Sequence, residues 1–132
     1  MKLRTESWLN FANADFKSAQ KLLEESDLAQ IVTFHCQQTI EKLLKAILEE
    51  YDVTIPKTHS LIKLYNLIPD KAKNELKIDE DDLIPIDKVY IDSRYPIDMG
   101  LLPFGTPDID DAKRIFDITG EIYNMIITSL RK

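Results

Sequence analysis

The chain has 132 residues, which fits a single domain, and 44% of them are apolar, which is enough to bury one sizeable core. Its three glycines argue against an all-β chain of many tight turns and against a glycine-rich phosphate loop. A single cysteine, Cys36, excludes an intramolecular disulfide and a cysteine-based zinc cluster. The net charge of −6 argues against general nucleic-acid binding, because such binding depends mostly on neutralising phosphates.

The chain has no apparent targeting or membrane segment. Its apolar runs are shorter than the roughly 18 residues that a membrane-spanning helix needs. The N-terminus becomes polar at once and lacks the apolar core of a signal peptide. We therefore expect one cytoplasmic domain over residues 1–132, without membrane contact.

The first half of the chain predicts two long helices joined by a short link. Residues 5–25 place an apolar stripe on one helical face, and Asp15 interrupts that stripe. Asp15 could be an edge carboxylate that reaches solvent. Because an unpaired buried carboxylate is costly, we favour the other interpretation, in which Asp15 pairs with a lysine or histidine of the second helix. That helix is predicted from about Leu28 to Tyr51, with Asp27 as its N-cap. The short link requires the two helices to form an antiparallel hairpin.

The predicted second helix has one apolar and one polar side. Gln37 falls inside the apolar arc, so we expect its amide to be buried and hydrogen-bonded between the first two helices. The polar side collects His35, Gln38, Lys42, Lys45 and Glu49. One interpretation is a solvated face, stabilised by side chains four positions apart. The other is a polar cleft facing the third helix, with His59 at its rim and two lysines, Lys42 and Lys45, directed at a phosphate.

The second half predicts shorter helices and one long final helix. The expected helices run from Ser60 to Ile68 with Thr58 as N-cap, from about Asp82 to Ser93, and from Thr106-Pro107 to the C-terminus. Residues 70–77 are compatible with a further helical turn or two. Helices without strands predict an all-α, up-and-down antiparallel bundle of about five helices, with two long N-terminal helices and a long C-terminal helix.

Oligomeric state and metal binding follow from the same patterns. The apolar stripes of the first, second and last helices are broader than a small bundle needs, and exposed apolar surplus usually marks an interface, so we expect a homodimer. The acidic run at 79–82 suits a helix start better than a metal site, because its carboxylates are contiguous. Two histidines are too few for a zinc site, so we expect no metal and no cofactor.

Four stretches of the chain carry a resemblance to a known family. They are Trp8, Ala12, Asp15 and Ala19 in the first helix, FHCQQTIEKLLKA at 34–46, KTHSL at 57–61, and SRYP at 93–96. In order and spacing this series resembles the HEPN (higher eukaryotes and prokaryotes nucleotide-binding) domain over nearly the whole chain. The glutamine pair followed by Glu-Lys and Leu-Lys-Ala is the most specific part of the match.

The resemblance implies a compact helical bundle that usually forms a homodimer. It also implies frequent partnership with a small nucleotidyltransferase of the minimal type, often as a toxin–antitoxin-like pair. Many HEPN proteins are metal-independent ribonucleases whose signature is an arginine with a histidine four to six positions later. Here Arg94 is followed by Tyr95 and by no histidine through Gly100, so the resemblance does not carry ribonuclease activity to this chain.

Three hypotheses remain. We favour a non-catalytic HEPN module that dimerises and binds a minimal nucleotidyltransferase or a nucleotide-like ligand. The second is an atypical metal-independent ribonuclease acting on RNA, in which Arg94 holds phosphate, Tyr95 stacks on a base and His59 or another group supplies the proton. The third is a plain dimerisation unit in which Arg94 caps its helix or pairs with an aspartate. No catalytic residue is assigned. The candidate ligand-binding residues are Arg94, Tyr95, Lys42, Lys45, His59 and His35.

Overall fold

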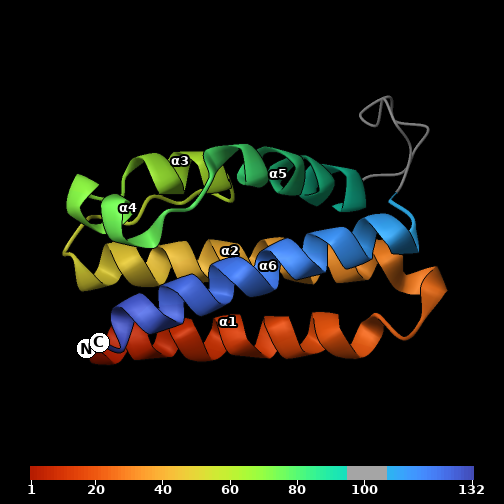
Figure 1. Cartoon of the computed structure of the whole chain (residues 1–132), viewed down its shortest axis with the longest axis horizontal. Helices are drawn as coiled ribbons and strands as arrows, with labels where there is room; N and C mark the ends of the chain where they lie inside the picture. Colours follow the sequence, from red (N-terminus) through yellow and green to blue (C-terminus); the bar gives the residue numbers. More distant parts are fainter. Residues whose placement is uncertain (95–106) are drawn as a thin grey trace.

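Two long N-terminal helices, α1 (Leu3–Leu22) and α2 (Ala29–Glu50), lie antiparallel, as predicted (Figure 1). The computed structural model describes residues 1–94 and 107–132, with side chains for 1–89 and 107–132. The other helices are α3 (Leu61–Asn66), α4 (Asp70–Leu76), α5 (Glu80–Arg94) and α6 (Ile109–Leu130). The all-α bundle with a long final helix is confirmed. The described part of the chain contains six helices rather than about five, because residues 70–76 form a helix of their own.

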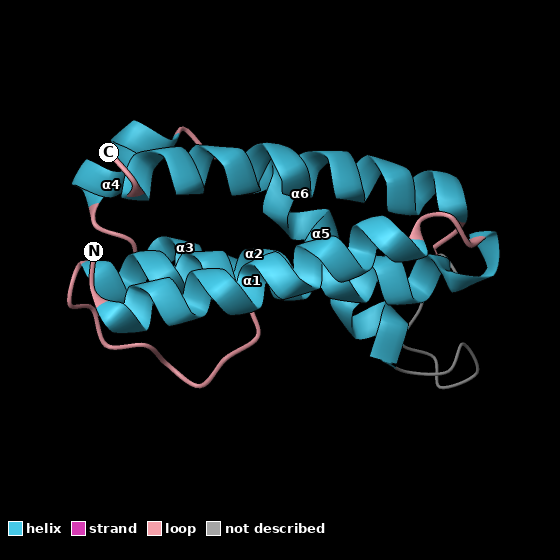
Figure 2. Ribbon diagram, turned by 90° about the horizontal axis from the view of Figure 1, so that it is seen from below, coloured by secondary structure: helices cyan, strands magenta, loops and turns pink. Residues whose placement is uncertain are grey.

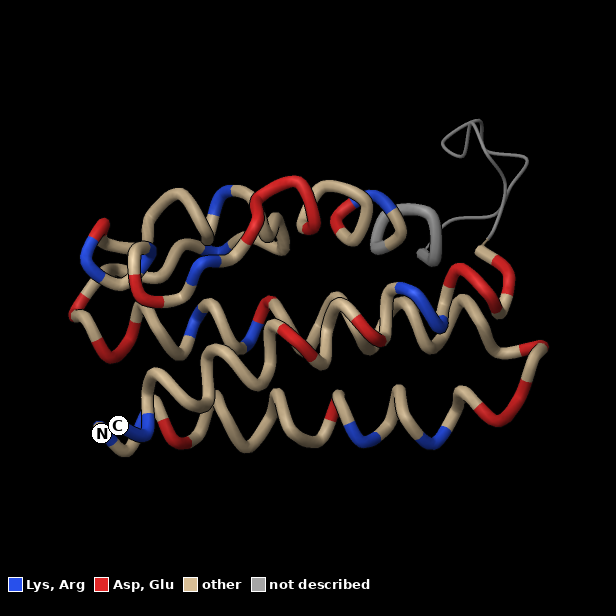
Figure 3. The backbone as a smooth tube through the Cα atoms, in the orientation of Figure 1, with Lys and Arg blue, Asp and Glu red and all other residues tan. Residues whose placement is uncertain are grey.

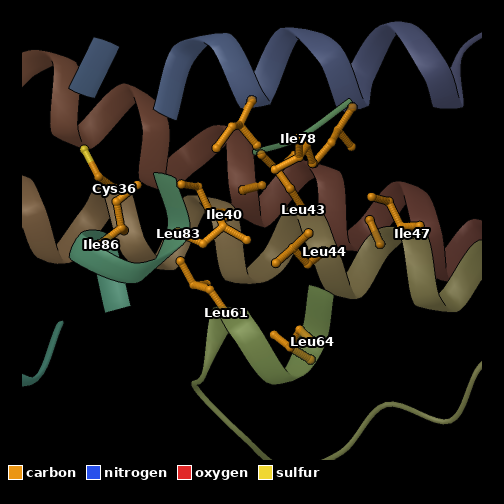
Figure 4. Packing of buried hydrophobic residues seen from close by; sticks show 14 of the residues in the cluster. Cys36, Ile40, Leu43, Leu44, Ile47, Leu61, Leu64, Ile78, Leu83 and Ile86 are labelled. Atoms are coloured by element: carbon orange, nitrogen blue, oxygen red, sulfur yellow. The ribbon is translucent and has the colours of Figure 1, made fainter. Parts of the chain in front are cut away.

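Helix α2 is the centre of the bundle, since α1, α3, α5 and α6 all pack against it. Its apolar side chains lie in the core beside those of α3 and α5, and Figure 4 shows Ile40 and Leu44 close to Leu61 and Leu83. All four side chains are fully buried. At about 25 cal/mol per Å² of apolar surface, burial of this kind supplies most of the stability of a small domain. A helix with neighbours on several sides also has little surface left for water.

Aromatic side chains join α1 to α6. The ring of Phe16 is stacked with Phe116 and Tyr123, at centroid distances of 5.0 and 4.9 Å. The Tyr123 hydroxyl donates to Asn13 Oδ1 at 3.1 Å. Offset aromatic pairs contribute about 0.5–1.5 kcal/mol beyond their buried area, so this stack fixes where α6 crosses α1.

The predicted caps of α2 and α3 are wrong. A 3₁₀ turn, Ser26–Leu28, precedes α2, and Leu28 stands at the N-cap position without a side-chain cap bond, so Asp27 is not the cap. Ser60, rather than Thr58, caps α3, and its hydroxyl accepts from the Lys63 N–H at 3.2 Å. Thr58 instead accepts from the Ser60 N–H at 3.1 Å and shapes the approach to the helix.

Both helices of the C-terminal half start elsewhere than predicted. Helix α5 begins at Glu80 rather than near Asp82, after Asp79 accepts from the Asp81 N–H at 2.9 Å, and Pro85 lies inside the helix. Thr106 lies outside the described residues. Helix α6 begins at Ile109 with Asp108 as its N-cap, so the predicted start at Pro107 is two residues early.

Charged residues recur along the long helices (Figure 3). Consistent with this, no helix of the described segments is both long and apolar enough to cross a membrane.

Candidate functional site

The polar side of α2 is largely covered by α1, so the solvated-face interpretation is wrong for its central residues. His35 and Lys42 are partly buried, and the side chain of Lys45 is only 11% exposed. Cations so far from water need a carboxylate nearby, because burying an unpaired charge is costly. Two buried carboxylates, one on α1 and one on α2 itself, meet that need.

Asp15 is the first of these carboxylates, and its predicted pairing with α2 is confirmed. Its Oδ1 lies 2.9 Å from Nδ1 of His35, and its Oδ2 accepts a hydrogen bond from Nζ of Lys42. Burial alone would raise the pKa of Asp15, but the hydrogen bonds and charges of His35 and Lys42 outweigh it and lower the pKa. Asp15 is therefore ionised at neutral pH and joins α1 to α2.

Glu41 is the second carboxylate, and sequence reasoning did not identify it as a site residue. Its side chain is 4% exposed, its Oε2 accepts from Nζ of Lys45 at 3.1 Å, and its Oε1 lies 2.9 Å from Nδ1 of His59. Nζ of Lys45 also lies 5.5 Å from the ring centre of Trp8, a cation–π contact. The sequence offered two signals for Glu41: its spacing four positions before Lys45, and its place in the Glu-Lys pair of the family resemblance.

Gln37 is fully buried, as predicted, but its partner is not on α1. Its Nε2 donates to the backbone oxygen of His59 at 2.7 Å, and its Oε1 accepts from Nε2 of Gln38 at 2.8 Å. The amide therefore ties the segment before α3 to the middle of α2. This tie and the contact with Glu41 hold the backbone and the ring of His59, while 58% of the His59 side chain stays exposed.

Asp87 of α5 binds the start of α3, next to the segment that Gln37 holds. Its carboxylate accepts from the backbone N–H groups of Leu61 at 2.8 Å and Ile62 at 3.2 Å, and from the Ser60 hydroxyl at 3.4 Å. Burial raises the pKa of Asp87, and the nearby charge of Glu41 adds to the rise, while these three hydrogen bonds oppose it. Asp87 was also missed from the sequence, because nothing local connects it to a helix 26 residues earlier.

Cys36 is a core thiol. Its side chain is fully buried, and burial raises the pKa of the thiol to about 12. A thiolate, not a thiol, is the nucleophile, so Cys36 cannot act as one here. Within the described residues, no group of three or more His, Cys, Asp or Glu side chains could hold a metal ion.

The predicted ligand-binding residues separate into three groups. His35 and Lys42 meet at Asp15, and Lys45 and His59 meet at Glu41. Arg94 is the last residue of α5, but its side chain and the whole of Tyr95 lie outside the described residues.

Two hollows lie between α1 and its neighbours. The larger, of about 520 Å³, is lined by Arg4, Ser7, Trp8, Phe11, Glu49, Val53, Thr54 and Ile55. The smaller, of about 380 Å³, is lined by Lys17, Ser18, Lys21, Leu22 and His35. Figure 2 shows the segment between α2 and α3 running along the α1–α2 pair on the side away from α6.

A helical bundle around one central helix, with two carboxylate-centred networks beside α1, defines a small all-α domain. The sequence model of the HEPN domain matches residues 5–130, so the chain belongs to the HEPN family, as the resemblance indicated. The structure is similar to that of TT1696 from Thermus thermophilus, with 25% identity, a TM-score of 0.77, and 96% of this chain and 98% of that chain covered. It shares its fold with ST0689, described as an archaeal HEPN homologue, with 23% identity, a TM-score of 0.69 and 98% of each chain covered. None of the curated protein sequences matches this chain.

Proposed function

We propose that this HEPN domain acts by binding rather than by catalysis, as a homodimer whose partner is a minimal-type nucleotidyltransferase or a nucleotide-like ligand. A toxin–antitoxin-like pair is the expected setting. The observation that carries this proposal is the state of the two central lysines. Lys42 is held by Asp15 of α1 and Lys45 by Glu41 of its own helix, so both charges already have a carboxylate partner. A substrate phosphate would have to compete with these buried carboxylates.

The apolar side chains that remain exposed support a role in association. Leu3 and Phe11 of α1 are 89% and 61% exposed, and Leu67 and Ile84 are exposed beside α3 and within α5. Figure 1 shows α1 and α5 on opposite sides of α2. Exposed apolar groups on two separate faces suit a domain that contacts both a second copy and another partner.

The test is to measure assembly directly. Light scattering on the purified chain should give twice the monomer mass, and coexpression with the nucleotidyltransferase encoded nearest to it should yield a stable complex. Calorimetry with ATP and AMP tests the nucleotide-like ligand. A monomer that retains no nucleotidyltransferase and binds neither nucleotide would contradict the proposal.

A second candidate function, an atypical ribonuclease, is favoured by one observation. The exposed imidazole of His59 is anchored by the buried carboxylate of Glu41, an arrangement that orients a histidine for proton transfer. In this alternative His59 would take the proton of the ribose 2′-hydroxyl while Arg94 binds the phosphate and Tyr95 stacks on a base.

Cleavage of single-stranded RNA in excess EDTA separates the two candidates. The ribonuclease alternative requires cleavage by the wild-type chain and its loss in both His59→Ala and Arg94→Ala. Intact RNA after prolonged incubation with the wild-type dimer would rule this alternative out and leave the binding role.

A further inference from the structure

The larger hollow has the composition of a protein-docking groove. Its walls are Trp8 and Phe11 from α1 and Val53 and Ile55 from the segment after α2. Nζ of Lys45 lies 5.5 Å from the centre of the Trp8 ring, and this contact restrains one wall of the groove before anything binds. Phe11 is large and apolar yet 61% exposed, and aromatic side chains in such positions are frequent anchors of protein interfaces.

The smaller hollow is basic. Lys17 and Lys21 line it and are exposed, and among the described residues neither lysine forms an ion pair. They differ in this from Lys42 and Lys45, whose charges are neutralised by buried carboxylates. The uncompensated positive charge of this face therefore lies at one end.

The two hollows share one face of α1. Trp8, Phe11, Asp15, Ser18 and Leu22 follow one another at steps of three or four residues, which keeps them on one side of a helix. At 1.5 Å per residue, Lys21 lies about 15 Å along the axis from Phe11. Between them Asp15 is paired with Lys42, so the middle of the face carries a neutral pair. We call the surface formed by the two hollows the α1 docking face.

The charges on this face favour one class of binding partner over the others. An acidic segment is attracted to Lys17 and Lys21. The phosphates of a nucleic acid, in contrast, would be repelled by Glu49 in the larger hollow and by the net charge of −6 of the chain. A second copy is disfavoured as well. A two-fold contact through parallel α1 helices would set Lys21 against its own counterpart. An antiparallel contact would offer Lys21 no free carboxylate among the described residues of this face, because Glu49 is paired with Arg4 and Asp15 with Lys42.

We propose that the α1 docking face binds an acidic, amphipathic helix of a partner protein, which places an apolar anchor in the Trp8–Phe11 groove and carboxylates beside Lys17 and Lys21. This inference rests on the proposed binding role and names the surface and the chemistry of the partner. The segment needs its anchor and its acidic residues about ten positions, or three helical turns, apart, because that spacing matches the distance along α1.

The test uses a synthetic probe and the full chain. A fluorescein-labelled helical peptide of about 18 residues, with a Leu-Phe anchor at one end and two glutamates ten positions away, is titrated by fluorescence anisotropy. We expect saturable binding that weakens with added salt. The variants Phe11→Ala and Lys17→Glu/Lys21→Glu should each weaken binding about tenfold or more.

Matched control variants show whether the loss of binding is specific to the α1 docking face. Lys63→Glu/Lys113→Glu changes two exposed lysines of α3 and α6 by the same charge and should alter binding by less than about twofold. Changing the glutamates of the peptide to glutamine tests the charge contact with the protein untouched, and circular dichroism confirms that every variant is folded. Equal binding of the glutamine peptide, or no saturable binding at all, would overturn the inference.

Other outcomes identify another occupant. If single-stranded RNA binds in a Lys17- and Lys21-dependent manner and the peptide does not, the face binds nucleic acid. If Phe11→Ala halves the mass of the dimer, the face joins two copies. Either result overturns the docking proposal. If the Lys17→Glu/Lys21→Glu chain still forms an equally stable complex with a nucleotidyltransferase, the proposed function is supported. The assignment of the binding surface to the α1 docking face would then be wrong.

Discussion

At the scale of single residues, Asp15 joins α1 to α2 through two partners, His35 and Lys42. We expect Asp15→Asn to lower the free energy of unfolding by about 1–3 kcal/mol, because Lys42 would keep a partly buried charge without its carboxylate. Urea denaturation measures the change. Asp117→Asn, an exposed aspartate on α6, is the matched control and should change stability by less than about 0.5 kcal/mol.

The same carboxylate predicts an acid dependence. The pKa of Asp15 is lower in the folded chain than its ordinary value of about 3.9, so its stabilising contribution is complete above that value. It is lost as the pH falls through the lower, folded-state pKa. The stability difference between wild type and Asp15→Asn should therefore shrink from its value near pH 5 as the pH falls below about pH 4. A difference that stayed constant to about pH 3 would show that the charge of Asp15 is not what stabilises the hairpin.

Gln37 is the residue that ties the loop before α3 to the core. Gln37→Leu keeps the volume but leaves the His59 carbonyl and the Gln38 amide without their present partner. An unsatisfied buried polar group costs about 1–3 kcal/mol, so we expect a loss of that size, measured by thermal and urea unfolding. Gln20→Leu on the exposed side of α1 serves as the control. Equal stability of the two variants would mean that water replaces the lost bonds.

At the scale of elements, α3 depends on a carboxylate from another helix. Asp87→Ala removes the acceptor of two N-terminal N–H groups of α3, a loss comparable with that of a helix cap, about 1–2 kcal/mol. A helix of six residues has little stability of its own. We therefore expect hydrogen exchange to accelerate throughout α3 while α1 and α6 stay protected. Glu121→Ala on α6 should leave the exchange pattern unchanged, and uniform acceleration in the Asp87→Ala chain would indicate a global rather than a local effect.

These element-scale contacts also mark where sequence reasoning succeeds. Helical periodicity predicted α1, α2 and α6 because each carries an apolar stripe along one face, and the cost of burying a charge was enough to pair Asp15, which interrupts the stripe of α1, with α2. The polar side of α2 was misjudged because a pattern within one helix does not count the helices around it. Glu41 and Asp87 were missed because Glu41 contacts His59 in the loop before α3 and Asp87 binds the N-terminus of α3, and no local spacing encodes those two contacts. The prediction of a cap residue was wrong where several residues able to cap a helix stand close together, as Thr58 and Ser60 do.

At the scale of the whole molecule, the N-terminal and C-terminal ends of the chain lie next to each other. Figure 1 shows the two termini side by side, and Arg131 donates to Oε1 of Glu6 at 3.0 Å. Terminal proximity of this kind usually allows circular permutation. A chain that starts at Glu25, joins the old termini with a Gly/Ser linker of about six residues and ends at Glu24 should keep the native helical content by circular dichroism.

The permuted chain tests whether the α1–α2 hairpin directs folding. In the natural order, α1 and α2 are neighbours in sequence, so the contacts between them close short loops; in the permuted order they lie at opposite ends of the chain. Folding rates fall as contacts become less local, so refolding of the permuted chain should be several-fold slower, with most of the stability retained. Stopped-flow refolding from urea measures the rate. Equal rates in the two chains would place the rate-limiting contacts elsewhere, such as between α2 and α6, because those contacts keep the same order in both chains.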